Sequence, residues 1–186
     1  MEMGESFESV LMAAQAGAEW AFAELYDSYN PLLQRYFAAR ASSAAEDLAA
    51  DTWMGAARTL AKFSGDESRF RSWLFTIAHH RLVDYWQDRK RHGWDLSDGQ
   101  SLTDSAAIDD TEQTVVDSLS AQAAAGKIAA ALPPEQAEVV LLRVVAGLDV
   151  EQVAEIMGRR PGTVRVLQHR ALKKLSREFS LEPVTE

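Results

Sequence analysis

Apolar side chains recur at intervals of three and four residues through the first half of the chain, between residues 19 and 92. In the first part of this stretch they are Phe22, Leu25, Tyr26, Tyr29, Leu32, Leu33, Tyr36 and Phe37. Such spacing places them on one face of a helix and predicts several helices. Ser42-Ser43 is expected to break the first long helix and to cap the next, over residues 44–61. The polar cluster at 64–68 predicts a loop before the helical pattern resumes at Phe70.

The second half of the chain begins with a different pattern. Residues 93–121 are rich in Ser, Asp and Thr, have weak periodicity and carry no basic residue, which predicts a flexible linker. Helical spacing then returns, with a core expected from Val139, Val140, Leu141, Leu142, Val144 and Val145. The predicted fold is all-α, with two small helical domains joined by an acidic flexible linker. The expected parts are an N-terminal extension (1–18), a first domain (19–92), the linker (93–121), a second domain (122–180) and a tail (181–186).

The second domain contains the signals of two helices joined by a short turn. Asp149 can cap a helix, and Gln152, three residues on, can return a hydrogen bond to its backbone N–H. This short helix is expected over residues 150–157, ending at Gly158. Pro161 suits the first turn of the next helix, expected over 162–179. Helix, short turn and helix together predict a helix-turn-helix unit.

The second of these helices is basic on its surface. It carries Arg165, His169, Arg170, Lys173, Lys174 and Arg177, and no acidic residue occurs between Gly158 and Arg177. A helix in the major groove of DNA faces two phosphate ridges, which attract arginine and lysine and repel carboxylates. We therefore expect this helix to bind duplex DNA, with Arg165 and His169 on one face. The alternative is a solvated basic helix in a four-helix bundle.

The net charge of -9 argues at first against nucleic acid as a partner, but the charges are segregated along the chain. Residues 1–57 hold nine acidic residues against two basic ones, a net of -7. Residues 58–92 hold eight basic against four acidic, a net of +4, and residues 127–179 nine against six, a net of +3. Each domain thus has a basic segment that can meet DNA.

The basic segment of the first domain mixes arginines and lysines with aromatic residues between positions 63 and 91. Unpaired bases stack on aromatic rings while the backbone follows positive charge, so this mixture suits a single strand. Phe70, Trp73 and Ile77 are expected in the core instead, because they follow helical spacing. The contact surface is then the loop at 64–69 and the basic end of the helix that follows.

Several kinds of site and location are not expected from this sequence. Cysteine is absent, the N-terminus carries acids where a signal peptide carries bases, and no apolar run is long enough for a membrane span, so the chain is expected to be cytoplasmic. The neighbours His79 and His80 point about 100° apart on a helix, and no second pair accompanies them, so no metal is expected. Phosphate-loop, zinc-protease and nucleophile-elbow motifs are also absent, so we expect neither a cofactor nor an enzyme.

Ordered motifs occur in both domains. The first domain contains Ala45-Glu46-Asp47-Leu48, Asp51-Thr52-Trp53, Phe70-Arg71-Ser72-Trp73-Leu74-Phe75-Thr76-Ile77-Ala78 and Asp84. The second contains Leu132-Pro133-Pro134-Glu135-Gln136, Gly147-Leu148, Val153-Ala154-Glu155-Ile156-Met157-Gly158 and Pro161-Gly162-Thr163-Val164-Arg165. These blocks resemble conserved regions two and four of the extracytoplasmic-function (ECF) sigma factors of bacterial RNA polymerase. The resemblance covers nearly the whole chain except the linker and the ends.

The resemblance implies a non-enzymatic subunit that docks on core RNA polymerase, melts the -10 promoter element with its first domain, reads the -35 element with its second, and is held by an anti-sigma factor. Polymerase contacts would fall at Asp47, Leu48, Asp51 and Trp53, with core packing as the alternative for Leu48 and Trp53. The -10 contacts are expected at Ser64, Asp66, Arg69, His80, Arg89 and Arg91. The -35 contacts would be Arg165, Val166, His169 and Arg170, with Arg159, Arg160, Thr163 and Lys173 near the phosphates.

Two departures from the family pattern accompany this resemblance. His79-His80 stands where many relatives have Arg-Asn, and Val166-Leu167-Gln168 where many have Ser-Arg-Leu, so the promoter sequence does not follow from the resemblance. The acidic linker has two interpretations, as a segment that enters the polymerase's RNA path or as a solubilising tether. The competing function is a stand-alone helix-turn-helix regulator whose first domain senses a signal or dimerises.

Overall fold

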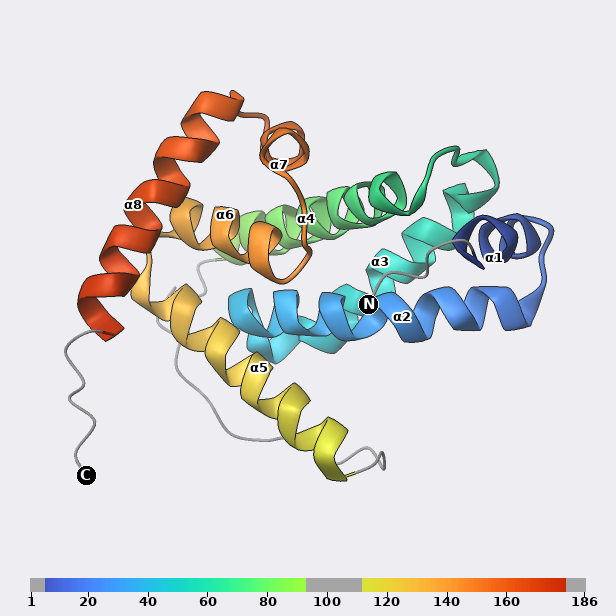
Figure 1. Cartoon of the computed structure of the whole chain (residues 1–186), viewed down its shortest axis with the longest axis horizontal. Coiled ribbons are helices and arrows are strands. Elements are labelled where there is room, and N and C mark those ends of the chain that lie inside the picture. Colours follow the sequence, from blue (N-terminus) through green and yellow to red (C-terminus); the bar gives the residue numbers. More distant parts are fainter. Residues whose placement is uncertain (1–5, 93–111, 180–186) are drawn as a thin grey trace.

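The computed structural model describes residues 6–92 and 112–179, which form helices joined by short turns. Figure 1 shows the arrangement of α1 (Ser6–Gln15), α2 (Glu19–Arg40), α3 (Ala45–Thr59), α4 (Glu67–Arg91), α5 (Glu112–Ala131), α6 (Pro134–Val144), α7 (Val150–Ile156) and α8 (Pro161–Phe179). Short 3-10 helices, Ser42–Ala44 and Leu60–Lys62, flank α3. The all-α prediction is confirmed. Within the described ranges, no helix combines the length and apolarity needed to cross a membrane.

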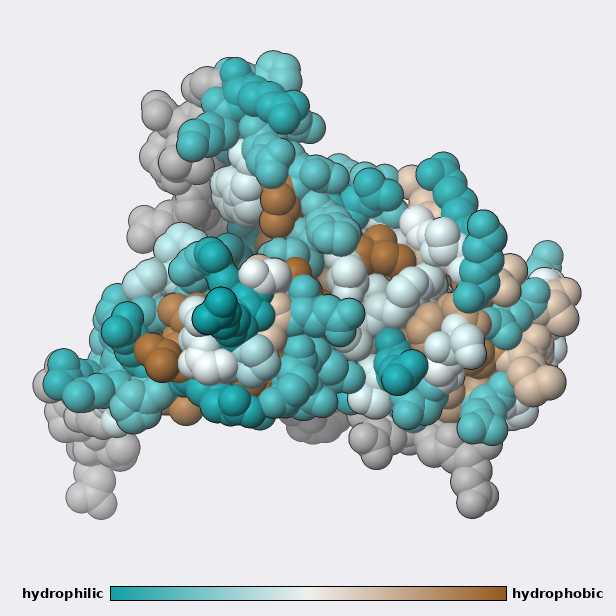
Figure 2. Space-filling model, turned by 90° about the horizontal axis from the view of Figure 1, so that it is seen from above, coloured by the Kyte–Doolittle hydropathy of each residue, from teal (hydrophilic) through white to brown (hydrophobic). Residues whose placement is uncertain are grey.

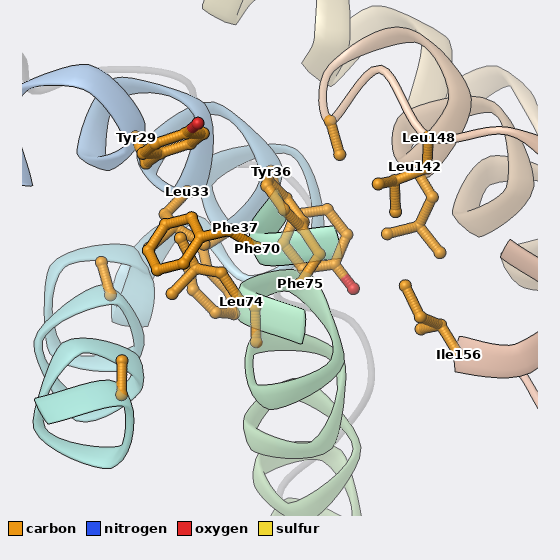
Figure 3. Close-up of a cluster of buried hydrophobic side chains, with 14 of the residues drawn as sticks. Tyr29, Leu33, Tyr36, Phe37, Phe70, Leu74, Phe75, Leu142, Leu148 and Ile156 are labelled. Carbon is orange, nitrogen blue, oxygen red and sulfur yellow. The ribbon is translucent and has the colours of Figure 1, made fainter. Parts of the chain in front are cut away.

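Helices α1 to α4 form the first domain around a core of aromatic rings. Tyr29 and Phe37 of α2 and Phe70 and Leu74 of α4 are almost fully buried, and Figure 3 shows them converging from two helices. The Phe70 ring lies 5.1 Å from the Tyr29 ring and 5.6 Å from the Phe63 ring, centroid to centroid. Rings that meet at an angle at this spacing stabilise each other beyond the area they bury. The core position expected for Phe70 is confirmed.

Helix α1 belongs to the first domain's core, although residues 1–18 were expected as an extension. Phe7 is only 1% exposed, and its ring lies 5.5 Å from the ring of Phe70. The side-chain nitrogen of Gln15 donates hydrogen bonds to the carbonyl oxygens of Leu60 and Phe63, at 3.0 and 2.7 Å. These bonds tie the end of α1 to the connection between α3 and α4. The packing of the first domain therefore starts before residue 19.

The starts of α3 and α4 differ in how they are capped. The Asp66 carboxylate caps α4 by accepting a hydrogen bond from the backbone N–H of Arg69 at 2.8 Å. Ser42-Ser43 does not cap α3, because both serines lie in a 3-10 turn closed by the Ala44 N–H and the Ala41 carbonyl at 2.9 Å. The residue before α3 is therefore Ala44, which has no side chain to cap with, and the predicted serine cap is wrong.

The second domain, α5 to α8, contains the expected helix-turn-helix. The capping box at the start of α7 is confirmed: Asp149 accepts from the backbone of Gln152 at 2.7 Å, and the Gln152 side chain accepts from the backbone of Asp149 at 2.9 Å. Gly158 follows α7 with φ at 60°, a left-handed conformation that favours glycine, and Pro161 opens α8. A small apolar cluster that includes Ala171 fixes α8 to α5 and α6.

Helix α5 begins at Glu112, within the segment expected as linker. Its sequence is rich in alanine, which has the highest helix propensity, and α5 packs obliquely against α2 (Figure 1), with Ala125 buried. Propensity and packing thus form a helix despite the weak periodicity. The rest of the expected linker, residues 93–111, and the tail at 181–186 lie outside the described residues.

The two domains pack against each other. One cluster of buried apolar side chains continues from the aromatic core of the first domain into the second, through Leu141, Leu142, Leu148 and Val153. Helix α5 contacts α2, and α7 contacts α4. Seen from above, hydrophilic residues cover most of the face, with smaller apolar areas among them (Figure 2). The sequence predicted two tethered domains, and the structure joins them through a shared apolar seam.

The position of Phe7 predicts that α1 stabilises the whole first domain. Phe7→Ala should lower the free energy of unfolding by about 3 kcal/mol or more, because a buried phenylalanine is lost and a cavity remains. Met12→Ala, on the same helix but 70% exposed, should change it by less than about 0.5 kcal/mol. Urea unfolding followed by circular dichroism measures both. Equal effects of the two substitutions would show that α1 is not part of the core.

Candidate nucleic-acid and polymerase interface

Helix α8 presents the expected DNA contacts to solvent. Val164 and Ala171 are fully buried and Leu175 nearly so, and together they hold one side of the helix against the domain. The residues expected to meet the -35 duplex or its phosphates are all exposed: Arg159, Arg160, Thr163, Arg165, Val166, His169, Arg170 and Lys173. The structure therefore brings this set together on one helix and the turn before it. Such a surface fits a major groove between phosphate ridges.

Two of these arginines are paired with acids of the same domain. Arg165 donates to the carboxylate of Glu151 on α7 at 2.7 Å, and Arg159 pairs with Glu135 on α6. All four side chains are about half exposed or more, so each pair contributes little to stability and can exchange for a phosphate or a base. Sequence reasoning missed both acids, because their partners lie 14 and 24 residues away, beyond any helical spacing.

The residues expected to meet the -10 strand lie along the whole of α4 rather than at one place. Ser64, Asp66 and Arg69 are exposed at its start, and Arg91 is exposed at its last turn. Between Arg69 and Arg89 the helix rises by roughly 30 Å, at about 1.5 Å per residue. Asp66 also has a structural role as the cap of α4. A single strand that met both ends would have to follow the helix.

At the basic end of α4, an arginine contacts two aromatic rings. The Arg89 guanidinium lies 5.6 Å from the centre of the Tyr85 ring and 6.0 Å from that of Trp86, and it donates a hydrogen bond to the Tyr85 hydroxyl at 2.8 Å. Sequence reasoning named Arg89 but not this contact, which follows from the helical spacing of four residues. Cation and ring at one place are the combination that a stacked, unpaired base requires. Trp73 is half-buried and packs with Phe63.

The two histidines in the middle of α4 have different surroundings. His80 is exposed in an open groove lined also by Ile77, Arg81 and Asp84. His79 lies on an adjacent side of the helix, with Nδ1 2.8 Å from a carboxylate oxygen of Glu138, on α6 of the second domain. His80 thus remains a candidate for contact with the -10 strand, whereas His79 takes part in packing between the domains.

The α3 residues expected to meet polymerase divide into two sets. Leu48 and Trp53 are buried, 6% and 5% exposed, so their alternative role in core packing is the one that the structure supports. The indole N–H of Trp53 donates to the side-chain oxygen of Asn30 at 3.2 Å. Asp47 and Asp51 are exposed one helical turn apart and form an acidic face of α3. The buried side chains of Leu48 and Trp53 fix the orientation of α3, so that Asp47 and Asp51 face solvent.

Comparison with known proteins places these features in one family. The family model of sigma-70 region 2 matches residues 25–92, and that of sigma-70 region 4 matches residues 123–175. The ECF RNA polymerase sigma factor BldN of Streptomyces coelicolor is 35% identical over 88% of this chain, which spans 62% of its length. The ECF RNA polymerase sigma factor ShbA of Streptomyces griseus is 31% identical, over 87% of this chain and 89% of its own.

A solved structure agrees with this assignment. The sigma factor RpoE of Bartonella quintana, in complex with the anti-sigma factor NepR, has a TM-score of 0.64 and 26% identity over 87% of this chain and 98% of its own. Two helical domains with the sigma-70 region 2 and region 4 patterns define the class of protein. The chain belongs to the ECF group of RNA polymerase sigma factors.

The pairing of Arg165 with Glu151 predicts that this acid competes with DNA. Glu151→Gln should increase the affinity of the protein for duplex promoter DNA, by up to about fivefold, because an exposed pair is worth about 0–1 kcal/mol. Glu155→Gln, an equal change of charge at an exposed position of the same helix, is the matched control. Fluorescence anisotropy at several salt concentrations measures both. An equal gain for the two variants would indicate net charge alone as the cause.

Proposed function

We propose that this sigma factor binds core RNA polymerase through the acidic face of α3, meets the melted -10 strand along α4 and reads the -35 duplex with α8. In this role it acts in the cytoplasm as a non-enzymatic subunit that directs polymerase to its promoters. The two regions have different roles. Region 2, with α1 packed on it, docks on polymerase and melts the -10 element, and the helix-turn-helix of region 4 reads the -35 element.

The observation that carries the proposal is the surface of α8. Eight candidate contacts are exposed on this helix and the turn before it, while Val164 and Ala171 are buried on the opposite side. No acid lies between Gly158 and Arg177, so this part of α8 carries no carboxylate of its own that phosphate ridges would repel. A basic helix that served only as a surface of a bundle would not require this separation of charge.

A protein partner is also part of the proposal. The similar RpoE structure is a complex with the anti-sigma factor NepR, and the curated relatives are RNA polymerase sigma factors. We infer that an anti-sigma factor holds this chain until a signal releases it.

The experiment that tests the function is run-off transcription with core polymerase on a library of genomic fragments. Promoter-specific transcripts that depend on added protein, and share -10 and -35 sequences, would support it. Submicromolar binding of the protein to duplex DNA at physiological salt without polymerase, and no dependent transcripts, would instead support a stand-alone helix-turn-helix regulator.

The acidic face of α3 predicts the effect of a charge reversal. Asp51→Arg should weaken binding to core polymerase at least tenfold and leave the fold intact, because Asp51 is exposed on the surface of α3. Glu155→Arg makes the same change of charge on an exposed helix of the second domain and should bind core enzyme normally. A titration of labelled core enzyme measures both affinities. Unchanged affinity for Asp51→Arg would contradict the docking face.

Substitutions on α8 should reduce transcription in two different ways. A panel of promoters with single-base changes in the -35 element distinguishes them. Arg165→Ala should reduce transcription and relax the preference at one position, because arginine can bond guanine O6 and N7 together, worth about 1–3 kcal/mol of discrimination. Lys173→Ala should lower transcription about equally on all promoters and reduce the salt slope by about one, as a phosphate contact does. If Arg165→Ala weakened every variant by one factor, Arg165 would be a phosphate contact.

A further inference from the structure

Among the described side chains of the second domain, one carboxylate is buried against the first domain. Glu138 on α6 is 4% exposed, and all three of its polar partners come from the first domain. The Tyr36 hydroxyl of α2 donates a hydrogen bond to Oε1, and His79 Nδ1 of α4 lies 2.8 Å from the same oxygen. Arg40 Nε lies 3.2 Å from Oε2, as an ion pair without hydrogen-bond geometry.

The protonation states of this cluster follow from its surroundings. Burial by itself raises the pKa of Glu138, but the hydrogen bond from His79, the charge of Arg40 and the bond from Tyr36 outweigh it and hold the pKa below its ordinary value. Burial and the neighbouring carboxylate raise the pKa of Tyr36 far above its ordinary value. Glu138 is therefore ionised and Tyr36 is a neutral donor. Since a carboxylate only accepts, His79 carries a proton on Nδ1.

These interactions stabilise only the packed arrangement of the two domains. A buried carboxylate is costly unless compensated, and here the partners that the structure shows for it all belong to the other domain. If the domains separate, water solvates the Glu138 carboxylate, so its charge does not remain buried without partners. Figure 3 shows Tyr36 and Phe75 on one side of the boundary facing Leu142 and Ile156 on the other. The polar cluster is thus surrounded by apolar contacts between the two domains, and both sets of contacts are lost when the domains separate.

A second set of contacts holds the helix-turn-helix to the start of α4. The side-chain nitrogen of Gln152 lies 3.0 Å from the Ser68 hydroxyl and 3.3 Å from its carbonyl oxygen. A Cβ at Gly147 would lie 3.1 Å from a guanidinium nitrogen of Arg71, so this turn lies directly on α4. Gly147 is in the left-handed region, with φ at 66°, and its missing side chain leaves room for Arg71.

This arrangement brings the two proposed DNA-reading surfaces too close together for one promoter. Arg165 touches Glu151, and the next residue, Gln152, touches Ser68, the neighbour of Arg69. The path from Arg165 to Arg69 consists of two side-chain contacts and two backbone steps of about 3.8 Å each. The two residues therefore lie within roughly 30 Å of each other. Elements numbered -10 and -35 lie about 25 base pairs apart, roughly 85 Å at about 3.4 Å per pair. The packed form therefore cannot occupy both.

We propose that Glu138, with Tyr36, Arg40 and His79, is an interdomain clasp that keeps the free sigma factor in a closed form, and that the clasp must open before both promoter elements can be bound. The closed form is a property of the chain alone, whereas its consequence for transcription rests on the proposed function. The capping residues Asp66 and Asp149 and the apolar cluster around Ala171 lie outside the clasp, whereas Tyr36 also packs in the aromatic core of the first domain. We expect each domain to keep its helices when the clasp opens.

The test measures the distance between the domains in the full-length chain without polymerase. Cysteine is absent from the sequence, so Ser28→Cys on α2 and Ser176→Cys on α8, both exposed, give two unique sites for spin labels. Electron paramagnetic resonance should give one narrow distance distribution for the otherwise unchanged protein. Glu138→Ala should raise the ratio of open to closed molecules at least tenfold, seen as a broad distribution at longer distance.

Two further variants make the result specific. Glu135→Gln, on the same helix but in an exposed pair within the second domain, should leave the narrow distribution unchanged. Tyr36→Phe keeps the buried ring and removes one hydrogen bond, so it should open the chain to a smaller extent while far-UV circular dichroism stays that of the unchanged protein. Its effect and that of Glu138→Ala should not add, because both act on one contact.

The outcomes separate the clasp from the proposed function. Opening by Glu138→Ala and Tyr36→Phe, but not by Glu135→Gln, supports the clasp whether or not polymerase responds. An unchanged narrow distribution in Glu138→Ala, or a broad one in the unchanged protein, overturns it. In run-off transcription at limiting sigma factor, Glu138→Ala should give several-fold more product. Absence of promoter-specific transcripts from the unchanged protein would overturn the proposed function and leave the distance result standing.

Discussion

The carboxylate of Glu138, buried between the two domains, is the interaction that the arrangement of this molecule depends on. An ionised side chain that is 4% exposed needs cationic and hydrogen-bonding partners, and Arg40, His79 and Tyr36 supply them from the other domain. The position of α6 against α2 and α4 follows from this requirement. The apolar seam around the cluster adds buried area, which is non-directional, whereas the hydrogen bonds of the cluster need defined distances and angles.

Within each domain the core has a second effect, which is to turn the charged surfaces outward. The aromatic core around Phe70 fixes α4, so that its basic end and its capped start are exposed. Ala171 and Val164 do the same for α8 and leave its arginines free of the core. An acidic chain with a net charge of -9 can therefore offer basic surfaces to DNA, because most of its acids lie outside α4 and α8.

Much of this could be predicted from the sequence, because the signals involved are local. Helical spacing predicted the main helices, and the pair of Asp149 and Gln152 predicted the capping box, since a cap depends on residues three apart. The ordered motifs also predicted the family, which the matches to regions 2 and 4 confirm. The exposure of the α8 residues followed from the same periodicity, which places Val164 and Ala171 opposite Arg165.

Only the tertiary structure decided which of the predicted contact residues are exposed and how the two domains pack against each other. Leu48 and Trp53 belong to motifs that suggest contact with polymerase, yet both are buried, because burial depends on helices that lie far apart in sequence. Glu138 looks like any surface acid of a helix, and its three partners are 59 to 102 residues away. Local propensity determines a helix and its caps, whereas a buried charge is defined by what surrounds it, and those surroundings exist only once the chain has folded.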